Sequence, residues 1–565
     1  MRTSVAASLL LSALTNAREL NVTSFRSVSA QPIAPAGSVK VPADFFSFGF
    51  ETAFLHHFNN NFSDNIVASV GARMGKPLII RIGGTSGDLV SIDPHLSNAT
   101  KCVKGPGCPI DSRATFELGP SYFETFKLFP NATMTIQAPI SPYQEKNKDG
   151  SKREAKMDAP HGADMTNDKH KKPEYAPEDW MDQSLEYVKL AYEALGPKRV
   201  AGIALGNEPD YYNYGPEEYT RRALALQKRI IDELHLEGDD RRIFEIGDIP
   251  NSVIVKRNRD QHFTLTDVVE GGLAKNGYAK FAAQHFYQVG AGNDYSGELM
   301  QQTLMNHTAI TERFPPLNKS IADIKKTDPK IDFVLSETAG VMGGRPIKYA
   351  GGFGSAMWAV DFHLTAMAAG VKRVSNTMRP EAAHAFWVSD SSAPKTRRPM
   401  VQGVFPSAPF IADFVGKDDQ GKVIELPTGH ELFTAYAKYD VHTGKLARIA
   451  LINLKRWDPT SPEKRGAASV TLDVGDRNAE NVRMERMESG QGSAGLGLDY
   501  GGPTHNVTWA GEQWSHKVDK GKGHYVLGGR VQEIVHVNHG KAEVLIPDTE
   551  AAIIYFYDGD VTIQL

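Results

Sequence analysis

Eight short apolar runs, separated by stretches with helical spacing, are the feature that most constrains how this chain of 565 residues folds. Each run is typical of a buried strand, and several intervening segments place apolar residues three and four positions apart. The runs are Phe45–Glu51, Pro77–Gly83, Thr133–Ala138, Arg199–Leu205, Ile243–Ile246, Lys280–Phe286, Phe333–Ser336 and Arg373–Thr377. Eight strands alternating with helices predict an α/β protein with a (β/α)8 TIM barrel over residues 42–390.

A doubly wound parallel sheet also alternates strands with helices and is the alternative architecture. That fold binds phosphate through a glycine-rich loop after its first strand, and no such loop follows Phe45–Glu51. We therefore favour the barrel for this part of the chain.

The pattern changes near Pro399, where strand-like runs follow one another without helical spacing. Such runs, separated by turns, predict a C-terminal antiparallel β-sandwich over residues 391–565. This domain is either a structural support for the barrel or a carbohydrate-binding module, and the lack of an obvious exposed aromatic cluster favours the support. A short alternating run within residues 18–41 is either a strand of that later domain or a frayed leader.

Residues 1–17 have the features of a secretory signal peptide, with Arg2 near the start and an apolar core from Val5 to Leu14. No later apolar run is long enough to span a bilayer, so we expect no membrane partner. A net charge of −4 gives no indication of a nucleic-acid partner. Seven Asn-x-Ser/Thr sequons support a secreted, extracellular glycoprotein: Asn21, Asn61, Asn98, Asn131, Asn306, Asn318 and Asn506.

The two cysteines, Cys102 and Cys108, lie in one loop with Gly and Pro residues between them. Gly and Pro permit a tight ring, and an oxidising compartment favours a disulfide. A metal site needs more ligands than one cysteine pair, so we expect no metal here.

Glu208 and Glu337 are the candidate catalytic residues. Each follows an apolar strand run, which is where barrel enzymes keep their chemistry. Two carboxylates in that position are suited to glycoside hydrolysis, which needs no cofactor. The alternative is that both are ordinary surface residues. The Asn207-Glu208-Pro209 sequence and the three tyrosines after it argue against that alternative.

Further segments near the strand ends are candidates for ligand binding. Arg81–Asp88 is glycine-rich and is either a close approach to a ligand or a plain turn. Tyr349–Gly354 combines a Tyr, glycines and a helix start, which suits an anion unless the glycines serve packing. The charged insertion at residues 144–172 is either a lid over the site or an inert loop, and its place on the active-site side of a barrel slightly favours the lid.

These segments together resemble glycoside hydrolase family 79, which contains β-glucuronidases, fungal ones among them, and heparanases. Asn207-Glu208-Pro209 and Glu337 are similar to the wider clan, and the closer resemblance lies in Arg81–Thr85, Gln284–Tyr287 and Tyr349–Gly352. The resemblance implies a barrel followed by a β-sandwich that takes an N-terminal strand from residues 18–41. The nine residues from Gly340 to Lys348 make the spacing between Glu337 and Tyr349 longer than the family pattern.

By this resemblance Glu208 is the acid/base and Glu337 the nucleophile. Asn207 would hold the sugar 2-hydroxyl, and Tyr287, Tyr349 and Gly352 would surround the uronate carboxylate. The implied substrate-binding set is Glu51, Thr85, Asn207, His285, Tyr287, Tyr349, Gly351 and Gly352.

The expected function is that of a secreted retaining exo-β-glucuronidase. It would remove β-linked glucuronic acid, with tolerance of a 4-O-methyl group left open, from glycans such as arabinogalactan side chains. One rival is an endo-acting, heparanase-like glycosidase, which a groove across the barrel mouth would mark. Another is a non-catalytic secreted glycan-binding protein, against which the presence of both Glu208 and Glu337 argues.

Overall fold

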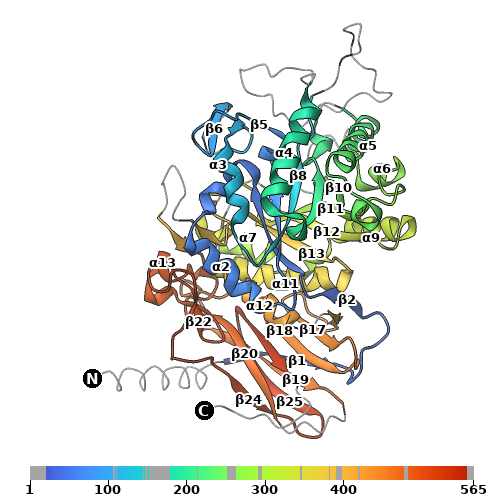
Figure 1. Ribbon diagram of the computed structural model, residues 1–565. Coiled ribbons are helices and arrows are strands. Elements are labelled where there is room, and N and C mark those ends of the chain that lie inside the picture. Colours follow the sequence, from blue (N-terminus) through green and yellow to red (C-terminus); the bar gives the residue numbers. More distant parts are fainter. Residues whose placement is uncertain are drawn as a thin grey trace.

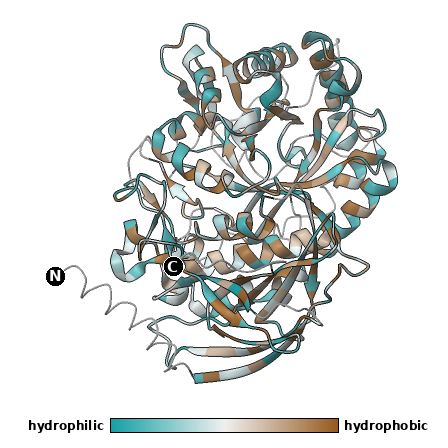
Figure 2. Ribbon diagram, turned by 60° about the horizontal axis from the view of Figure 1, so that its bottom comes forward, coloured by the Kyte–Doolittle hydropathy of each residue, from teal (hydrophilic) through white to brown (hydrophobic). Residues whose placement is uncertain are grey.

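The computed structural model describes residues 21–556, apart from residues 106–107, 110, 144–145, 147–150, 152–178, 213, 251–262, 291–294, 344–345, 381, 390–397, 418–419 and 476–480. A barrel with its surrounding helices lies above a layer of antiparallel strands (Figure 1). Hydrophobic residues colour long stretches of the strands, and hydrophilic residues colour much of the outer helices (Figure 2). None of the described helices combines the length and the apolar character needed to cross a bilayer.

The eight predicted strands close into one parallel barrel, which confirms the predicted fold class. Each pairs with the next in chain order, and the last returns to the first. The strands are β3 (Phe46–Glu51), β4 (Ile79–Gly83), β8 (Thr133–Ala138), β9 (Val200–Leu205), β10 (Phe244–Ile249), β11 (Ala279–Val289), β12 (Asp332–Val341) and β13 (Arg373–Met378).

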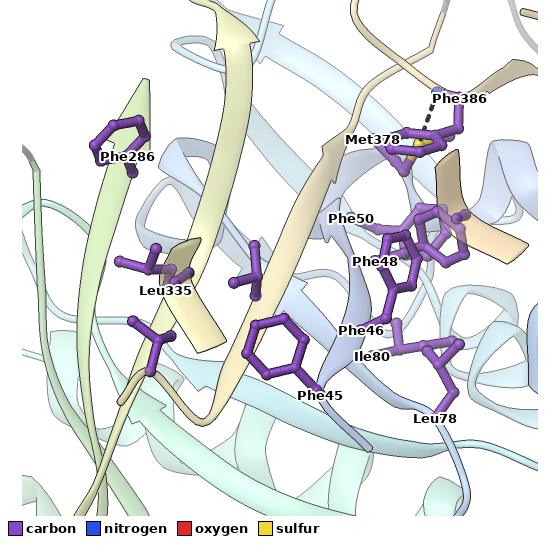
Figure 3. Close-up of a cluster of buried hydrophobic side chains, with 14 of the residues drawn as sticks. Phe45, Phe46, Phe48, Phe50, Leu78, Ile80, Phe286, Leu335, Met378 and Phe386 are labelled. Atoms are coloured by element: carbon purple, nitrogen blue, oxygen red, sulfur yellow. Dashed lines mark hydrogen bonds between the residues drawn. The ribbon is translucent and has the colours of Figure 1, made fainter. Parts of the chain in front are cut away.

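Strand β3 shows how alternation builds both the core and the site. Phe46, Phe48 and Phe50 lie on one face, spaced along the strand among other buried hydrophobic side chains (Figure 3). The alternate residues face the barrel interior, where Gly49 lies against Arg81 of the neighbouring strand. Glu51 ends the strand with the same interior parity and is buried.

Helices on the outside cover the barrel, as the apolar spacing predicted. They include α2 (Asn61–Gly71), α4 (Trp180–Leu195), α5 (Pro216–Glu233), α9 (Pro315–Thr327) and α11 (Phe353–Ala369), together with the short α6 (Leu265–Glu270). Shorter helices are α3 (Pro120–Phe123), α7 (Gly297–Thr303), α8 (His307–Thr311) and α10 (Ile347–Ala350). Helix α11 is buried along nearly its whole length because the barrel and the antiparallel strands enclose it.

Two further sheets pack through a hydrophobic core of their own, and all their strand pairs are antiparallel except the one that β1 forms. The larger sheet contains β2 (Val39–Pro42), β16 (Gln420–Leu426), β17 (Phe433–Asp440), β18 (Leu446–Asn453), β26 (Glu550–Tyr555), β20 (Asn481–Ser489), β21 (Val507–Trp509), β22 (Glu512–Gln513), β23 (His524–Tyr525) and β24 (Glu533–His536). The smaller contains β1 (Asn21–Ser29), β19 (Gly466–Asp473) and β25 (Lys541–Pro547). Strand β1 runs parallel to β19, so the N-terminal segment is a strand of this sandwich.

The predicted boundary at residue 390 falls in the segment 390–397, which lies outside the described residues. Strand β14 (Trp387–Val388) pairs with β15 (Met400–Val401) across that position. Helix α12 (Ser407–Val415) interrupts the region predicted to be all strands and contacts helices α11 and α2 of the barrel. The short helix α13 (Leu498–Gly501) is a second exception.

Strands β11 and β12 extend beyond their predicted ends. The register pairs His285 with Glu337 and continues to Val289 with Val341. Glu337 therefore lies inside β12 rather than at its end. Apolar runs alone underestimate such strands, because the polar residues of the site interrupt the run while the backbone pairing continues.

Candidate active site

The two predicted catalytic glutamates lie together near the carboxyl ends of the barrel strands. Glu208 comes shortly after β9, and Glu337 belongs to β12. One carboxylate oxygen of each lies within 4.8 Å of the other. Retaining glycosidases hold their carboxyl groups about 5–5.5 Å apart and inverting ones about 6.5–9.5 Å, so this separation fits the retaining geometry.

Glu208 has an unusual backbone conformation. Its φ of 47° and ψ of 51° place it in the left-handed region, which few non-glycine residues adopt. Its amide N–H donates to the carbonyl of Asp248 at 3.0 Å, and Pro209 begins the short 3-10 helix η5 (Pro209–Tyr211) directly after it. Tertiary contacts with β10 therefore hold a conformation that local propensity disfavours, as is common at functional sites.

Both carboxylate oxygens of Glu337 accept hydrogen bonds. Arg81 Nη1 donates to Oε2 at 3.0 Å, and the Tyr287 hydroxyl donates to Oε1. Burial alone would raise the pKa of Glu337, but His285, Arg81 and the Tyr287 hydroxyl together lower it. Glu337 is therefore ionised at neutral pH and held in one orientation, as a carboxylate nucleophile requires.

His285 contacts the carboxylates rather than open space. The ring is fully buried, with Nδ1 2.9 Å from Glu208 Oε1 and Nε2 3.4 Å from Asp248 Oδ1. Because both nitrogens face carboxylates, the predicted direct contact of His285 with a sugar finds no support in its surroundings. Burial acts to lower the pKa of His285, yet Glu337, Asp248 and Glu208 raise it to about 10, so the ring is an imidazolium.

Arg81 connects three polar groups inside the barrel. Besides Glu337, its guanidinium donates from Nη2 to Asn207 Oδ1 at 2.7 Å and to Asp248 Oδ1 at 3.1 Å. An arginine provides several donors in a fixed plane, which suits simultaneous contacts of this kind. The sequence contained a signal for Arg81, a lone cation within the apolar run Leu78–Ile82, but the prediction named it only as the start of the segment Arg81–Asp88 and gave it no role.

Asn207 is held by two residues, Asp88 in the loop after β4 and Arg81 on β4. Its backbone N–H donates to Asp88 Oδ2 at 2.8 Å, and its side-chain oxygen accepts from Arg81. Because Arg81 only donates, the amide must turn Oδ1 toward it, which leaves Nδ2 as the donating end. The predicted role of Asn207 in holding the sugar 2-hydroxyl stays a prediction.

Asp88 joins the loops that follow three barrel strands. Its carboxylate accepts from the backbone N–H groups of Ile140 and Asn207 and from the Tyr212 hydroxyl. Burial raises the pKa of Asp88 to about 7, although these hydrogen bonds oppose the rise. Nothing in the sequence distinguishes Asp88 from an ordinary turn residue, because its partners lie far along the chain.

Glu51 is buried at the end of β3 and accepts from Ser86 through N–H at 3.1 Å and Oγ at 2.7 Å. Burial and the charge of Glu337 raise the pKa of Glu51. Gly84 has φ +86°, and a Cβ there would lie 2.4 Å from the Glu51 carboxylate. The glycine thus admits Glu51 rather than a ligand backbone approach, and the neighbouring Thr85 is half-buried at the start of the 3-10 helix η2 (Thr85–Asp88).

Tyr349 and the glycines after it lie in a packing junction. The Tyr349 ring is buried beside Tyr295, and its hydroxyl lies 2.9 Å from the Thr303 hydroxyl. The amide of Phe353, which begins α11, donates to the Gly495 carbonyl at 2.8 Å. A Cβ on Gly351 would lie 2.3 Å from the carbonyl oxygen of Ala383. The helix start therefore already has a carbonyl partner.

Gly352 has the same tight surroundings, since a Cβ there would lie 2.7 Å from the carbonyl oxygen of Lys348. These contacts give Tyr349, Gly351 and Gly352 a structural role, and their binding of a carboxylate stays a prediction without contact support. The alternative explanation, that packing accounts for the glycines, is the one the contacts favour.

A metal centre is a poor match for this cluster. Within the described part of the chain, Glu208, His285 and Glu337 are the one group whose ligand atoms converge closely enough to hold an ion. The guanidinium of Arg81 and the hydroxyl of Tyr287 already donate to the Glu337 carboxylate. A cation beside a bound guanidinium meets like-charge repulsion, so the donor set fits a carboxylate pair better than a metal.

The remaining predicted positions lie apart from the glutamates. Cys102 and Cys108 form a disulfide at β6 (Thr100–Lys104), in a small sheet with β5 (Val90–Ile92) and β7 (Thr115–Leu118). The sequons Asn21, Asn61, Asn98, Asn131 and Asn318 are exposed, whereas Asn306 and Asn506 are half-buried. Asn306 caps helix α8, since its Oδ1 accepts from Ala309 N–H. Of residues 144–172, Lys146 and Ser151 are described, and the others lie outside the described residues. Residues 1–17 also lie outside them.

A cleft of about 570 Å³ lies away from the glutamates, between α2, α12 and the larger sheet. Basic side chains line it, and three of them have acidic or carbonyl partners. Arg73 and Arg530 form ion pairs with Asp413, and Arg448 donates to the carbonyls of Phe414 and Val415 that end α12. These contacts tie barrel helices to the sandwich, which explains the three arginines without a ligand.

Comparisons with known proteins show what this chain is similar to. The family model described as the glycosyl hydrolase family 79 C-terminal beta domain matches residues 435–553. A beta-glucuronidase from Aspergillus niger is 25% identical over 539 residues, covering 90% of this chain and 90% of the relative. A beta-glucuronidase from Neurospora crassa is 24% identical over 424 residues, covering 71% of this chain and 69% of the relative.

Solved structures share the fold over almost the whole chain. A 4-O-α-L-rhamnosyl-β-D-glucuronidase from Fusarium oxysporum superposes with a TM-score of 0.71 at 16% identity, covering 94% of this chain and 100% of that one. A family 51 α-L-arabinofuranosidase from Bifidobacterium longum gives a TM-score of 0.57 at 12% identity, covering 95% and 100%. At such identities the likeness shows a common architecture.

Proposed function

Because this chain is a member of glycoside hydrolase family 79, and therefore a glycosidase, we propose that it is a retaining exo-β-glucuronidase. The observation that carries the proposal is the pair Glu208 and Glu337, whose carboxylate oxygens lie within 4.8 Å at the carboxyl end of the barrel. The substrate class is supported by the names of the two fungal relatives, both beta-glucuronidases.

In the first step Glu208, protonated, gives its proton to the glycosidic oxygen while a Glu337 oxygen attacks the anomeric carbon. The bond between that carbon and the leaving oxygen breaks, and its electron pair stays with the leaving group. Arg81 and Tyr287 orient Glu337 for this attack through hydrogen bonds to its two oxygens.

In the second step Glu208, now a carboxylate, takes a proton from water as the water attacks the same carbon. The ester bond to Glu337 breaks and the sugar leaves with its anomeric configuration retained. Asn207 Nδ2 donates to the sugar 2-hydroxyl, because Arg81 fixes the opposite end of the amide.

We extend the proposal to a secreted glycoprotein that releases terminal glucuronic acid from glycans such as arabinogalactan side chains. The signal-peptide features and the sequons support secretion. Tolerance of a substituent on the sugar 4-hydroxyl also needs a test, since the Fusarium oxysporum protein of the same fold is described as a 4-O-α-L-rhamnosyl-β-D-glucuronidase.

The test is hydrolysis of 4-nitrophenyl β-glucuronide beside the β-glucoside, with proton NMR of the first sugar released. We expect faster hydrolysis of the glucuronide and release of the β-anomer. Release of the α-anomer would exclude the retaining mechanism, and a preference for the glucoside would exclude the uronate. Unsubstituted, 4-O-methylated and 4-O-rhamnosylated glucuronides then rank the tolerance at that position.

Exo action is tested separately with a long glucuronate-containing chain. An exo enzyme releases monosaccharide while the mean chain length falls slowly, whereas an endo enzyme shortens the chain before monosaccharide accumulates. Size-exclusion chromatography of heparan sulfate during the reaction measures the chain length. An early fall in that length would favour the heparanase-like alternative.

A further inference from the structure

Asp248 occupies a distorted position at the carboxyl end of β10. It is fully buried and has φ +51°, which is uncommon for a residue other than glycine. The pairing of β10 with β11 shifts register between Gly247 and Ile249, so Asp248 is the extra residue of a bulge. Bulges at barrel rims turn a side chain in a direction that regular pairing does not permit.

The bulge turns the Asp248 side chain toward Arg81 and His285, the partners of Glu337 and Glu208. Its Oδ1 accepts from Arg81 Nη2 at 3.1 Å and from Ser336 Oγ at 2.7 Å, and lies 3.4 Å from His285 Nε2. Its backbone carbonyl accepts the N–H of Glu208 at 3.0 Å. Asp248 therefore reaches both carboxylates indirectly, one through His285 and the other through Arg81.

We propose that Asp248 is a positioning residue that keeps His285 charged and aligned on Glu208 while it anchors the Arg81 guanidinium on Glu337. A buried Asp bonded to one nitrogen of a His fixes the proton and orientation of the other nitrogen. The inference depends on the proposed retaining mechanism, because it assigns Asp248 to the two carboxylates of that mechanism.

The charges around His285 support this assignment. Glu208, Asp248 and Glu337 face the ring from the loop after β9, from β10 and from β12, and the Arg81 guanidinium faces it from β4. Arg81 and His285 lower the pKa of Asp248 against the effect of burial, so it stays ionised. The Glu245–Arg373 ion pair lies next to Asp248 in the barrel interior, where burial and the charge of Asp248 raise the pKa of Glu245 to about 7.

The charge count stays constant during the first chemical step. Before the step, Asp248 and Glu337 are negative, Arg81 and His285 positive, and Glu208 neutral. After it, Glu337 is a neutral ester, and Glu208 is negative because its proton has gone to the leaving group. The sum is zero in both states, and His285 lies within reach of both glutamates, so it can stabilise the negative charge on either side. Without the charge of Asp248 the sum becomes +1, and His285 more readily loses its proton.

The test is Asp248→Asn, a change of nearly equal size, assayed with 4-nitrophenyl β-glucuronide over the full pH range. We expect kcat to fall at least about 10-fold with KM changed less than about 3-fold, since substrate binding does not involve Asp248. We also expect the alkaline limb of the kcat profile to move to lower pH by about one unit or more, because groups that must carry a proton, His285 among them, lose it more readily beside a neutral Asn.

Two further variants separate positioning from general support of the fold. Asp361→Asn is the matched control, because Asp361 is also fully buried but bonds Thr434 and Tyr436 at the barrel–sandwich junction. It should lower the melting temperature and leave kcat and its pH limbs unchanged. Ser336→Ala removes one neutral donor to Asp248 and should leave the alkaline limb in place.

The assignment is wrong if Asp248→Asn keeps kcat within about twofold and the alkaline limb unmoved, or if Asp361→Asn shifts that limb equally. Should the wild-type protein hydrolyse another β-glycoside in place of the glucuronide, the substrate proposal fails. The same pH comparison on that glycoside still decides the role of Asp248.

Discussion

Arg81 Nη1 lies 3.0 Å from Glu337 Oε2, which pairs a guanidinium from the second barrel strand with the carboxylate on the seventh. The pair is largely withdrawn from solvent, with 3% of the Arg81 side chain and 14% of the Glu337 side chain exposed. At such burial, loss of one partner costs much more than at the surface. Glu337, the proposed nucleophile, is therefore held ionised and oriented before any sugar binds.

Substitution of the two glutamates should give different kinetic results. Glu337→Gln removes the nucleophile and should lower kcat by at least about 1,000-fold on every glycoside. Glu208→Gln removes the acid, so 4-nitrophenyl glucuronide, whose leaving group needs little protonation, should keep its first step and show a burst of nitrophenol. An alkyl glucuronide should be hydrolysed far more slowly by this variant. If Glu337→Gln shows the burst instead, the two roles are exchanged.

Arg81→Lys should lower kcat by about 10- to 100-fold, although the charge is kept. A single ammonium cannot donate at once to Glu337, Asn207 and Asp248 in the plane that the guanidinium defines. Steady-state kinetics and thermal unfolding measure the two effects separately. Arg199→Lys is the matched control, because Arg199 donates to backbone carbonyls at Phe126 and Ala132. It should lower stability with little change in kcat, and an equal loss of kcat in both variants would contradict the assignment.

The barrel strands were predictable from the sequence because strands covered on both faces read as continuous apolar runs. Glu208 and Glu337 were predictable because each follows such a run. Asp248 was not, because a single Asp between Gly247 and Ile249 resembles a turn. Its partner Arg81 lies 167 residues away in the chain, and only the closed barrel brings the two side chains together.

The segment from Tyr349 to Gly352 was noticed in the sequence, but its role could not be predicted from the sequence. Glycines before a helix suit either an anion or close packing, and the sequence cannot decide between them. The deciding partner, the carbonyl of Gly495, comes from the sandwich domain. A contact between domains leaves no signal in the local pattern of either segment.

Tyr349→Phe should therefore change the ratio of kcat/KM for glucuronide to glucoside by less than about 3-fold. The hydroxyl that this change removes is 2.9 Å from the Thr303 hydroxyl, so the expected loss is about 1 kcal/mol of stability. Chemical denaturation and the two assays measure these quantities. A ratio that falls about 10-fold or more would restore Tyr349 as a carboxylate-binding residue.

The disulfide between Cys102 and Cys108 should support stability and not catalysis. Titration of the unfolded, unreduced protein should find no free thiol, because the two cysteines of the chain are joined. Replacing both with Ser should cost about 2 kcal/mol, as expected for a short closed loop, with kcat unchanged. Detection of two thiols per chain would contradict the bond and weaken the proposal of secretion.

Asp88 should make stability fall as pH rises toward neutrality. Burial raises its pKa to about 7 in the folded protein, whereas in the unfolded chain it is near 3.8. Between those values the folded protein keeps a proton that the unfolded chain has released. Stability therefore decreases with pH in this window, by at most about 1.4 kcal/mol per pH unit.

Asp88→Asn removes this titration, so the stability of wild type minus that of the variant should decrease from about pH 4.5 to about pH 7.5. Denaturant unfolding at a series of pH values, with the difference taken at each, isolates the contribution of this one group. Tyr212→Phe is the companion variant, because loss of a donor to the carboxylate raises the pKa of Asp88 further. It should extend the falling part of the curve to higher pH. Parallel pH curves for wild type and Asp88→Asn would mean that the carboxylate is ionised throughout, held by the N–H groups of Ile140 and Asn207.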